Sequence, residues 1–199
     1  MGDDGTVTHD SLPLKACAIG SQAVGKTTFF IRFIQGSFPG DYTRAVYEPT
    51  RYETSSDEHE VSIELNDVRS RLLNPQLKPL IYQNTDVVMM FYSVSDRESY
   101  LDVERVWLVD AQTHCPGVPI VLVGTKTDLR EVGGDTVTTG EGKELARRVR
   151  ATKFMEISSL LGEGLDDMMD EVVKCAVDHK LRKSSDSVIG KQRRPCRIL

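Results

Sequence analysis

The stretch Gly20-Ser21-Gln22-Ala23-Val24-Gly25-Lys26-Thr27 (GSQAVGKT) fits the pattern G-x-x-x-x-G-K-[ST]. The apolar run LKACAIG at 14–20 predicts a strand before it, and the apolar body of residues 26–34 predicts a helix after it. A loop in this context directs backbone N–H groups at an anion, where the helix dipole adds favourable charge. The lysine supplies a cation, and the threonine offers a hydroxyl to Mg²⁺. The stretch therefore predicts phosphate binding, although the glutamine at its third position can crowd a terminal phosphate.

Strand and helix patterns alternate along the rest of the chain. Period-two alternation at 50–54 and 61–65 predicts a hairpin with its turn at 54–60. Apolar runs predict buried strands at 87–94 and 120–124, and a further strand is expected at 153–157. Helices are expected from a capping box at Ser95–Glu98, over 141–149, and over 165–176. This order predicts a three-layer α/β fold with a six-stranded, mainly parallel sheet and one antiparallel edge strand.

Length and charge predict one domain with two tails. The 199 residues suit a single domain at 14–180, between an acidic tail at 1–13 and a basic, flexible tail at 181–199. Residues 184–195 have little apolar content and predict a disordered linker. No apolar run approaches the ~20 residues of a membrane span. The net charge of −5 argues against nucleic acid as a partner, and four cysteines without CxxC spacing indicate a reducing compartment.

A second motif, Thr125-Lys126-Thr127-Asp128, follows the predicted strand at 120–124. An aspartate at the carboxyl end of a strand can accept hydrogen bonds from both N1–H and the exocyclic amine of guanine, a pair of donors that adenine lacks. The stem of a neighbouring lysine can lie over the base. Together with the phosphate loop, this motif predicts a guanine-nucleotide site.

Four segments resemble the Rho branch of the Ras-like small GTPases. They are GSQAVGKT, FPGDY (38–42), CPGVPIVLVGTKTDLR (115–130) and MEISSL (155–160), and the resemblance extends over residues 14–180. The final Cys196-Arg197-Ile198-Leu199 is similar to the prenylation box of that family, with a terminal leucine that favours geranylgeranyl. The resemblance implies a P-loop G domain that binds GTP or GDP with Mg²⁺.

The resemblance also assigns roles to individual positions. It implies that Thr27 ligates Mg²⁺ and that Asp67 contacts the metal through water. The residues implied to hold the nucleotide are Gly20, Ala23, Val24, Gly25, Lys26, Thr27 and Thr28 at the phosphates, and Phe38, Lys126, Asp128, Ser158 and Ser159 at the base.

Departures from the family pattern concentrate at the γ-phosphate. Gln22 replaces a glycine, Ala45 replaces the threonine of switch I that ligates Mg²⁺, and in switch II Ser70 replaces a glycine and Arg71 the glutamine that orients water. The segment EVGGDTV at 131–137 is also too short for the helical insert of typical Rho proteins. No catalytic residue is therefore assigned, and GTP hydrolysis is expected to be slow or absent.

These features predict an atypical Rho-like GTP-binding signalling protein, monomeric, that binds effectors through switch segments 38–50 and 66–82 and influences actin and cell shape. The lipidated Cys196 and the basic tail are expected to hold it at an anionic membrane, on the cytoplasmic face of the plasma membrane, with a cytosolic pool. Two alternatives stay open. One is a nucleotide-independent pseudo-GTPase scaffold, and the other is a competent GTPase with rearranged catalytic residues.

Overall fold

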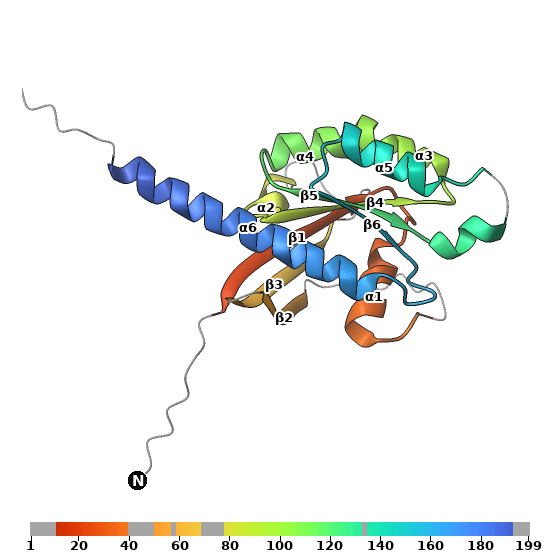
Figure 1. The fold of residues 1–199 in the computed structure, drawn as a ribbon, viewed down its shortest axis with the longest axis horizontal. Helices are drawn as coiled ribbons and strands as arrows, with labels where there is room; N and C mark the ends of the chain where they lie inside the picture. The colour runs from red at the N-terminus through yellow and green to blue at the C-terminus, as the bar shows by residue number, and fades with distance from the viewer. Residues whose placement is uncertain (1–10, 40–49, 57–58, 69–77, 133–134, 193–199) are drawn as a thin grey trace, which may run out of the picture.

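The computed structural model describes residues 11–39, 50–56, 59–68, 78–132 and 135–192, with side chains described as far as residue 185 (Figure 1). The elements along the chain are β1 (Leu12–Gly20), α1 (Lys26–Gln35), β2 (Thr50–Ser56), β3 (His59–Asp67), α2 (Lys78–Tyr82), β4 (Val87–Ser93), α3 (Arg97–Asp102), the π-helical turn η2 (Val103–Trp107), α4 (Leu108–His114), β5 (Ile120–Thr125), the 3₁₀ segment η3 (Thr127–Val132), α5 (Thr139–Arg148), β6 (Lys153–Ile157) and α6 (Leu165–Gln192).

The strands form one six-stranded sheet in the order β2-β3-β1-β4-β5-β6. β2 pairs antiparallel with β3, and every other pair is parallel. The predicted fold class, an α/β Ras-like G domain with one antiparallel edge strand, is confirmed. β1 lies between β3 and β4, so the loop that follows it opens at the middle of the carboxyl edge of the parallel strands, where α/β folds bind ligands.

Helices cover both faces of the sheet, as Figure 1 shows. Alternate residues of β1 supply the two cores: Ala16 and Ala18 pack with α1 and α6, while Cys17 and Ile19 pack with α2, η2 and α5. β4 is buried along its whole length. The near-continuous apolar runs read from the sequence therefore reflect burial on both faces.

Two local predictions needed correction. The helix after β4 is capped by Asp96, whose carboxylate accepts from the amide of Ser99, and not by Ser95, whose hydroxyl bonds to that of Ser93. Adjacent serine and aspartate are equally good caps, so local sequence could not choose between them. The hairpin strands also extend into the predicted turn, because Ser56 still pairs with His59.

The prediction of a disordered linker over 184–195 is wrong for residues 184–192, because α6 continues to Gln192. The hydroxyls of Ser184 and Ser185 donate to the carbonyls of Lys180 and Leu181, one turn earlier, each at 3.0 Å. No proline lies between Leu165, where α6 begins, and Pro195. Polar composition indicated an unburied segment, and Ser184 and Ser185 in this helix are exposed. Residues 193–195 and the acidic 1–10 lie outside the described residues, and β1 already begins at Leu12.

None of the helices in the described part of the chain is long and apolar enough to cross a membrane.

Two glycines of α5 provide a matched test of the packing between α5 and the sheet. A Cβ on Gly142 would lie 2.5 Å from both the Tyr92 hydroxyl and the Phe154 ring, and Tyr92 is also confined from the other side by Gly124. A Cβ on Gly140 would lie no closer than 3.8 Å to Thr138. Gly142→Ala should therefore lower the free energy of unfolding by about 1–3 kcal/mol through overpacking. Gly140→Ala should raise it by about 0.5–1 kcal/mol, because alanine is the better helix former. Chemical denaturation measures both, and equal effects would contradict the described packing.

Candidate functional site

The phosphate loop has a backbone that only particular residues can adopt. Gly20 and Gly25 have φ of 142° and 100°, and Ala23 has φ of 61°. A Cβ at Gly20 would lie 2.3 Å from the carbonyl oxygen of Phe91 on β4, so any side chain there would displace the central strand. Left-handed residues within such a turn direct successive N–H groups inward, which forms an anion-binding concavity.

The ammonium of Lys26, at the start of α1, is buried inside this loop. Its Nζ donates to the carbonyls of Gly20 at 2.7 Å and Ser21 at 2.8 Å. Burial lowers the pKa of Lys26 from 10.5 to about 8, and the nearby carboxylate of Asp67 opposes this shift. An ammonium has three donors, so the bonds to two loop carbonyls account for two of them. A phosphate oxygen is the acceptor and counter-charge that such a buried cation can bind.

The two predicted metal residues lie together beside the loop. The hydroxyl of Thr27 donates to Asp67 Oδ2 at 2.5 Å, and β3 places Asp67 opposite Ala18 of β1. Asp67 Oδ1 is buried and has no hydrogen-bond partner among the described residues. A hydroxyl and a carboxylate are oxygen ligands suited to Mg²⁺, which completes its shell with phosphate and water. The residues present therefore fit a magnesium ion.

The guanine motif is bonded directly to the phosphate loop. Thr125, the last residue of β5, donates from Oγ1 to the carbonyls of Val24 at 2.5 Å and Tyr92 at 3.0 Å. Lys126 has φ of 59°, and its Nζ donates to the carbonyl of Ala23 at 2.7 Å. Burial lowers the pKa of the Lys126 amine as well. The two motifs therefore form one site. Thr125 was named within the guanine motif but assigned no role from the sequence, because its only signal was a threonine ending an apolar strand.

Ser158 links the base-reading aspartate to the turn after β6. Its hydroxyl donates to Asp128 Oδ1 at 2.5 Å and accepts from the amide of Leu161 at 3.1 Å. Ser158 is fully buried, and Ser159 beside it is 9% exposed. The second carboxylate oxygen of Asp128 can accept further hydrogen bonds, so Ser158 orients this side chain without occupying both of its oxygens.

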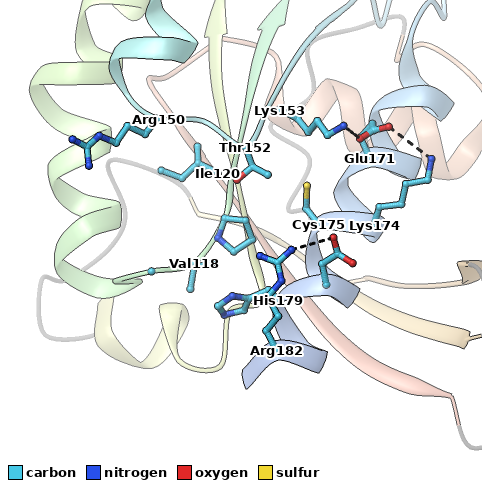
Figure 2. Close-up of a pocket in the computed structure, with 13 residues that line it drawn as sticks. Val118, Ile120, Arg150, Thr152, Lys153, Glu171, Lys174, Cys175, His179 and Arg182 are labelled. Atoms are coloured by element: carbon cyan, nitrogen blue, oxygen red, sulfur yellow. Dashed lines mark ion pairs between the residues drawn. The ribbon is translucent and has the colours of Figure 1, made fainter. Parts of the chain in front are cut away.

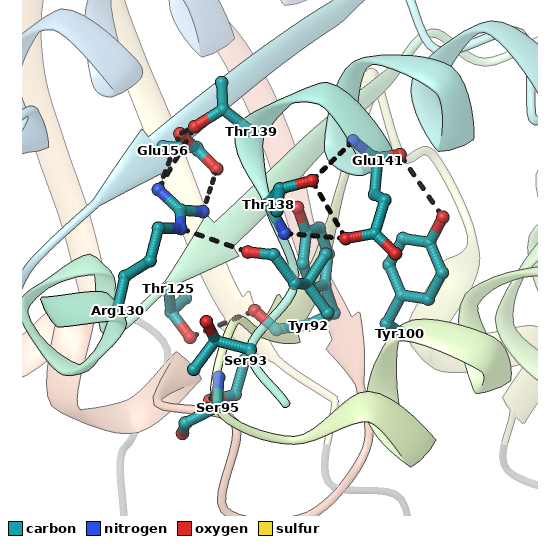
Figure 3. Close-up of polar contacts among 12 residues, drawn as sticks. Tyr92, Ser93, Ser95, Tyr100, Thr125, Arg130, Thr138, Thr139, Glu141 and Glu156 are labelled. Atoms are coloured by element: carbon teal, nitrogen blue, oxygen red, sulfur yellow. Dashed lines mark hydrogen bonds and ion pairs between the residues drawn. The ribbon is translucent and has the colours of Figure 1, made fainter. Parts of the chain in front are cut away.

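A half-buried ion pair fixes the segment that carries Asp128. Arg130 donates to Glu156 of β6 at 2.5 Å, and Thr139 donates to the same carboxylate at 2.7 Å (Figure 3). The same view shows the capping box of α5, in which Thr138 and Glu141 bond each other's backbone amides. The 3₁₀ segment η3 is thereby tied to both β6 and α5.

Comparison with known proteins agrees with this geometry. A model of the Ras family matches residues 15–178. The chain belongs to the Ras family. Among its relatives, "Rho-related GTP-binding protein RhoH" of Bos taurus is 35% identical over 174 residues, which cover 86% of this chain and 91% of that protein. The Mus musculus protein of the same description is 34% identical, with the same coverage. "Rho-related protein racM" of Dictyostelium discoideum is 32% identical over 167 residues, covering 81% of this chain and 88% of that protein. The chain is thus a divergent Rho-like member.

Several residues predicted for the site of this Rho-like chain are not among those joined by the hydrogen bonds above, or fall outside the described residues. Gln22 is exposed at the rim of the loop, Phe38 is 41% exposed, and Thr28 lies in the first turn of α1. The altered switch positions Ala45, Ser70 and Arg71 and the terminal Cys196 fall outside the described residues. Between η3, which ends at Val132, and α5, which begins at Thr139, the described residues form no helix.

A hollow of about 490 Å³ lies away from the nucleotide site, between α6 and the amino-terminal ends of β5 and β6 (Figure 2). Five of its charged side chains form ion pairs: Glu171 lies between Lys153 and Lys174, and Arg182 pairs with Asp178. Arg150 also lines the hollow.

The buried ammonium predicts a pH-dependent stability in the nucleotide-free protein. Because folding lowers the pKa of Lys26 from 10.5 to about 8, the charged form destabilises the fold. This cost is complete below about pH 8 and disappears as pH rises through 10.5. Lys26→Met should therefore raise the free energy of unfolding by about 2 kcal/mol at pH 7, with the difference shrinking toward pH 10. Urea titrations at several pH values measure this. The exposed Lys143→Met is the control and should show no such trend, and a Lys26→Met that destabilises at every pH would contradict the argument.

Proposed function

We propose that this Rho-like protein binds GTP with Mg²⁺ as a signalling protein and hydrolyses the nucleotide slowly or not at all. The observation that carries the proposal is a pair of buried charges at one loop. Within the described ranges, the hydrogen-bond acceptors of the Lys26 ammonium are backbone carbonyls, and Asp67 keeps one buried oxygen without a partner. Buried charges and unpaired oxygens are costly, and a magnesium–phosphate group offsets both costs.

Guanine is the base that the site fits. Asp128 is held by Ser158 at the carboxyl edge of the sheet, and the stem of Lys126 crosses toward the loop carbonyl of Ala23. A carboxylate accepts from two adjacent donors of guanine, whereas adenine presents none in that pattern. These contacts connect base and phosphate binding through one rigid set of hydrogen bonds.

The residues around the γ-phosphate argue against efficient turnover. Arg71 cannot orient an attacking water as glutamine does, Ala45 has no side-chain hydroxyl for the metal, and Gln22 occupies space that an incoming arginine finger needs. Such a finger typically contributes ~10³–10⁵ in rate. When bound, Mg²⁺ would neutralise charge on the phosphate oxygens. Nucleotide binding therefore does not require Gln22, Ala45 and Arg71 to match the family pattern.

The same changes bear on signalling. Switch segments 38–50 and 66–82 are the proposed effector surfaces, with actin and cell shape as the process they influence. Contacts that order switches against γ-phosphate and Mg²⁺ are reduced, so GTP and GDP forms should differ less than in a typical switch. The protein would then signal as a persistently loaded monomer.

A lipid anchor is the proposed means of membrane attachment. Cys196 would carry an isoprenoid, and the basic tail that leads to it contains Arg182, Lys183, Lys191, Arg193 and Arg194. Each basic residue near an anionic leaflet contributes about 1 kcal/mol of attraction. One lipid with a basic segment supplies the two signals that stable attachment requires, at the cytoplasmic face of the plasma membrane with a cytosolic pool.

The nucleotide that co-purifies with the protein tests the proposal. Protein purified with Mg²⁺ and no added nucleotide is denatured, and the released nucleotide is separated by chromatography. GTP at about one per protein is expected. Asp128→Asn should lose guanine nucleotide, because an amide cannot accept from both donors of the base. Mostly GDP would instead support a competent GTPase, and no nucleotide would support a scaffold that works without one.

Replacement of the terminal cysteine tests the anchor separately. Cys196→Ser cannot be prenylated and should move a fluorescently tagged chain from membrane to cytosol in cell fractionation. Cys175→Ser, a buried thiol of α6, is the matched control and should leave the distribution unchanged. Membrane retention of Cys196→Ser would refute lipidation at that residue.

A further inference from the structure

A polar network outside the nucleotide motifs connects the phosphate loop to the helix after β4. The hydroxyl of Ser21, the second residue of the loop, donates to Asp102 Oδ2 at 2.8 Å. The same hydroxyl accepts from the indole Nε1 of Trp107 at 3.0 Å. The partners lie 81 and 86 residues away in the chain, so this contact is set by the fold and not by local sequence.

The π-helical turn η2 allows both partners to reach one hydroxyl. Asp102 ends α3, and Trp107 ends η2, whose bond from the amide of Leu108 to the carbonyl of Val103 spans five residues. In a regular α-helix, residues five apart point about 140° away from each other. A π turn holds more residues per turn and brings such a pair toward the same side, and such turns are frequent at functional sites.

The network acts on the residue that also holds the buried ammonium. The carbonyl of Ser21 accepts from Lys26 Nζ, while its side chain is fixed by Asp102 and Trp107. Trp107 is only 6% exposed and belongs to the core with Val103, so its indole gives the loop a rigid support. The position of the Ser21 peptide therefore sets the position of Lys26 relative to the loop amides.

We propose that Asp102 and Trp107 are positioning residues that act through Ser21 to hold the phosphate loop in its nucleotide-binding form, and that Trp107 senses occupancy of the loop. The inference rests on the proposed function, because it concerns the same nucleotide. It adds two residues outside every nucleotide motif of the chain. A nucleotide that draws Lys26 toward its phosphates alters the Ser21 peptide and hence the bond to the indole.

The dissociation rate of a fluorescent GDP analogue, with Mg²⁺ present, tests the positioning role. Asp102→Ala leaves Ser21 without its acceptor and should speed dissociation about tenfold, the effect of losing a hydrogen bond to a charged group. Asp102→Asn keeps an oxygen acceptor and should restore most of the slow rate. Glu98→Ala, at an exposed acid of the same helix, is the control and should not change it. A purely structural role would lower the melting temperature of Asp102→Ala without changing the rate.

The emission of Trp107, the single tryptophan of the chain, tests the sensing role. Adding GDP and Mg²⁺ to nucleotide-free protein should shift the emission, and Ser21→Ala, which removes the acceptor of the indole N–H, should abolish most of that shift. An unchanged dissociation rate in Asp102→Ala, or an equal shift in Ser21→Ala, overturns this inference and leaves nucleotide binding in place. A native chain that binds no guanine nucleotide overturns both proposals.

Discussion

The burial of one ammonium inside a loop of backbone is the constraint on which the rest of the site depends. Lys26 is held by the carbonyls of Gly20 and Ser21, and burial moves its pKa to about 8. This arrangement requires that Gly20 lie against the carbonyl of Phe91 without a Cβ. Since β1 is a central strand, the loop is supported on both sides, and the surrounding hydrogen bonds serve to keep it closed around the cation.

The sequence predicted most of the fold because periodicity and glycine placement are local signals. The strand at 153–157 coincides with β6, and the burial of β1 and β4 on both faces follows from their apolar runs. The extension of α6 to Gln192 was missed because the polar composition of a segment indicates whether it is buried, not whether it is helical. The structure does bring together the predicted nucleotide residues of the phosphate loop with Lys126, Asp128 and Ser158. The hydrogen bonds that join these segments could not be predicted from the sequence. Thr125 to Val24 and Trp107 to Ser21 join residues 101 and 86 positions apart.

Holding a nucleotide and cleaving it place different demands on this site. Holding depends on Lys26, Thr27, Asp67 and the guanine motif, which the fold connects through short hydrogen bonds. Cleavage depends on a water, a fully ligated metal and space for a catalytic group, and Gln22, Ala45, Ser70 and Arg71 depart from the family pattern there. Gln22 is thus one of four departures from the family pattern at positions that the resemblance assigns to the γ-phosphate. Our proposal is that the chain binds GTP and hydrolyses it slowly or not at all.

Single-turnover phosphate release measures this central claim most directly. The protein is loaded with γ-labelled GTP, excess Mg²⁺ starts the reaction, and released phosphate is counted against bound nucleotide. The account predicts that the native chain keeps its GTP intact. A variant that combines Gln22→Gly, Ala45→Thr, Ser70→Gly and Arg71→Gln should release phosphate from the same bound state. Release from the native chain as fast as from that variant would contradict the account.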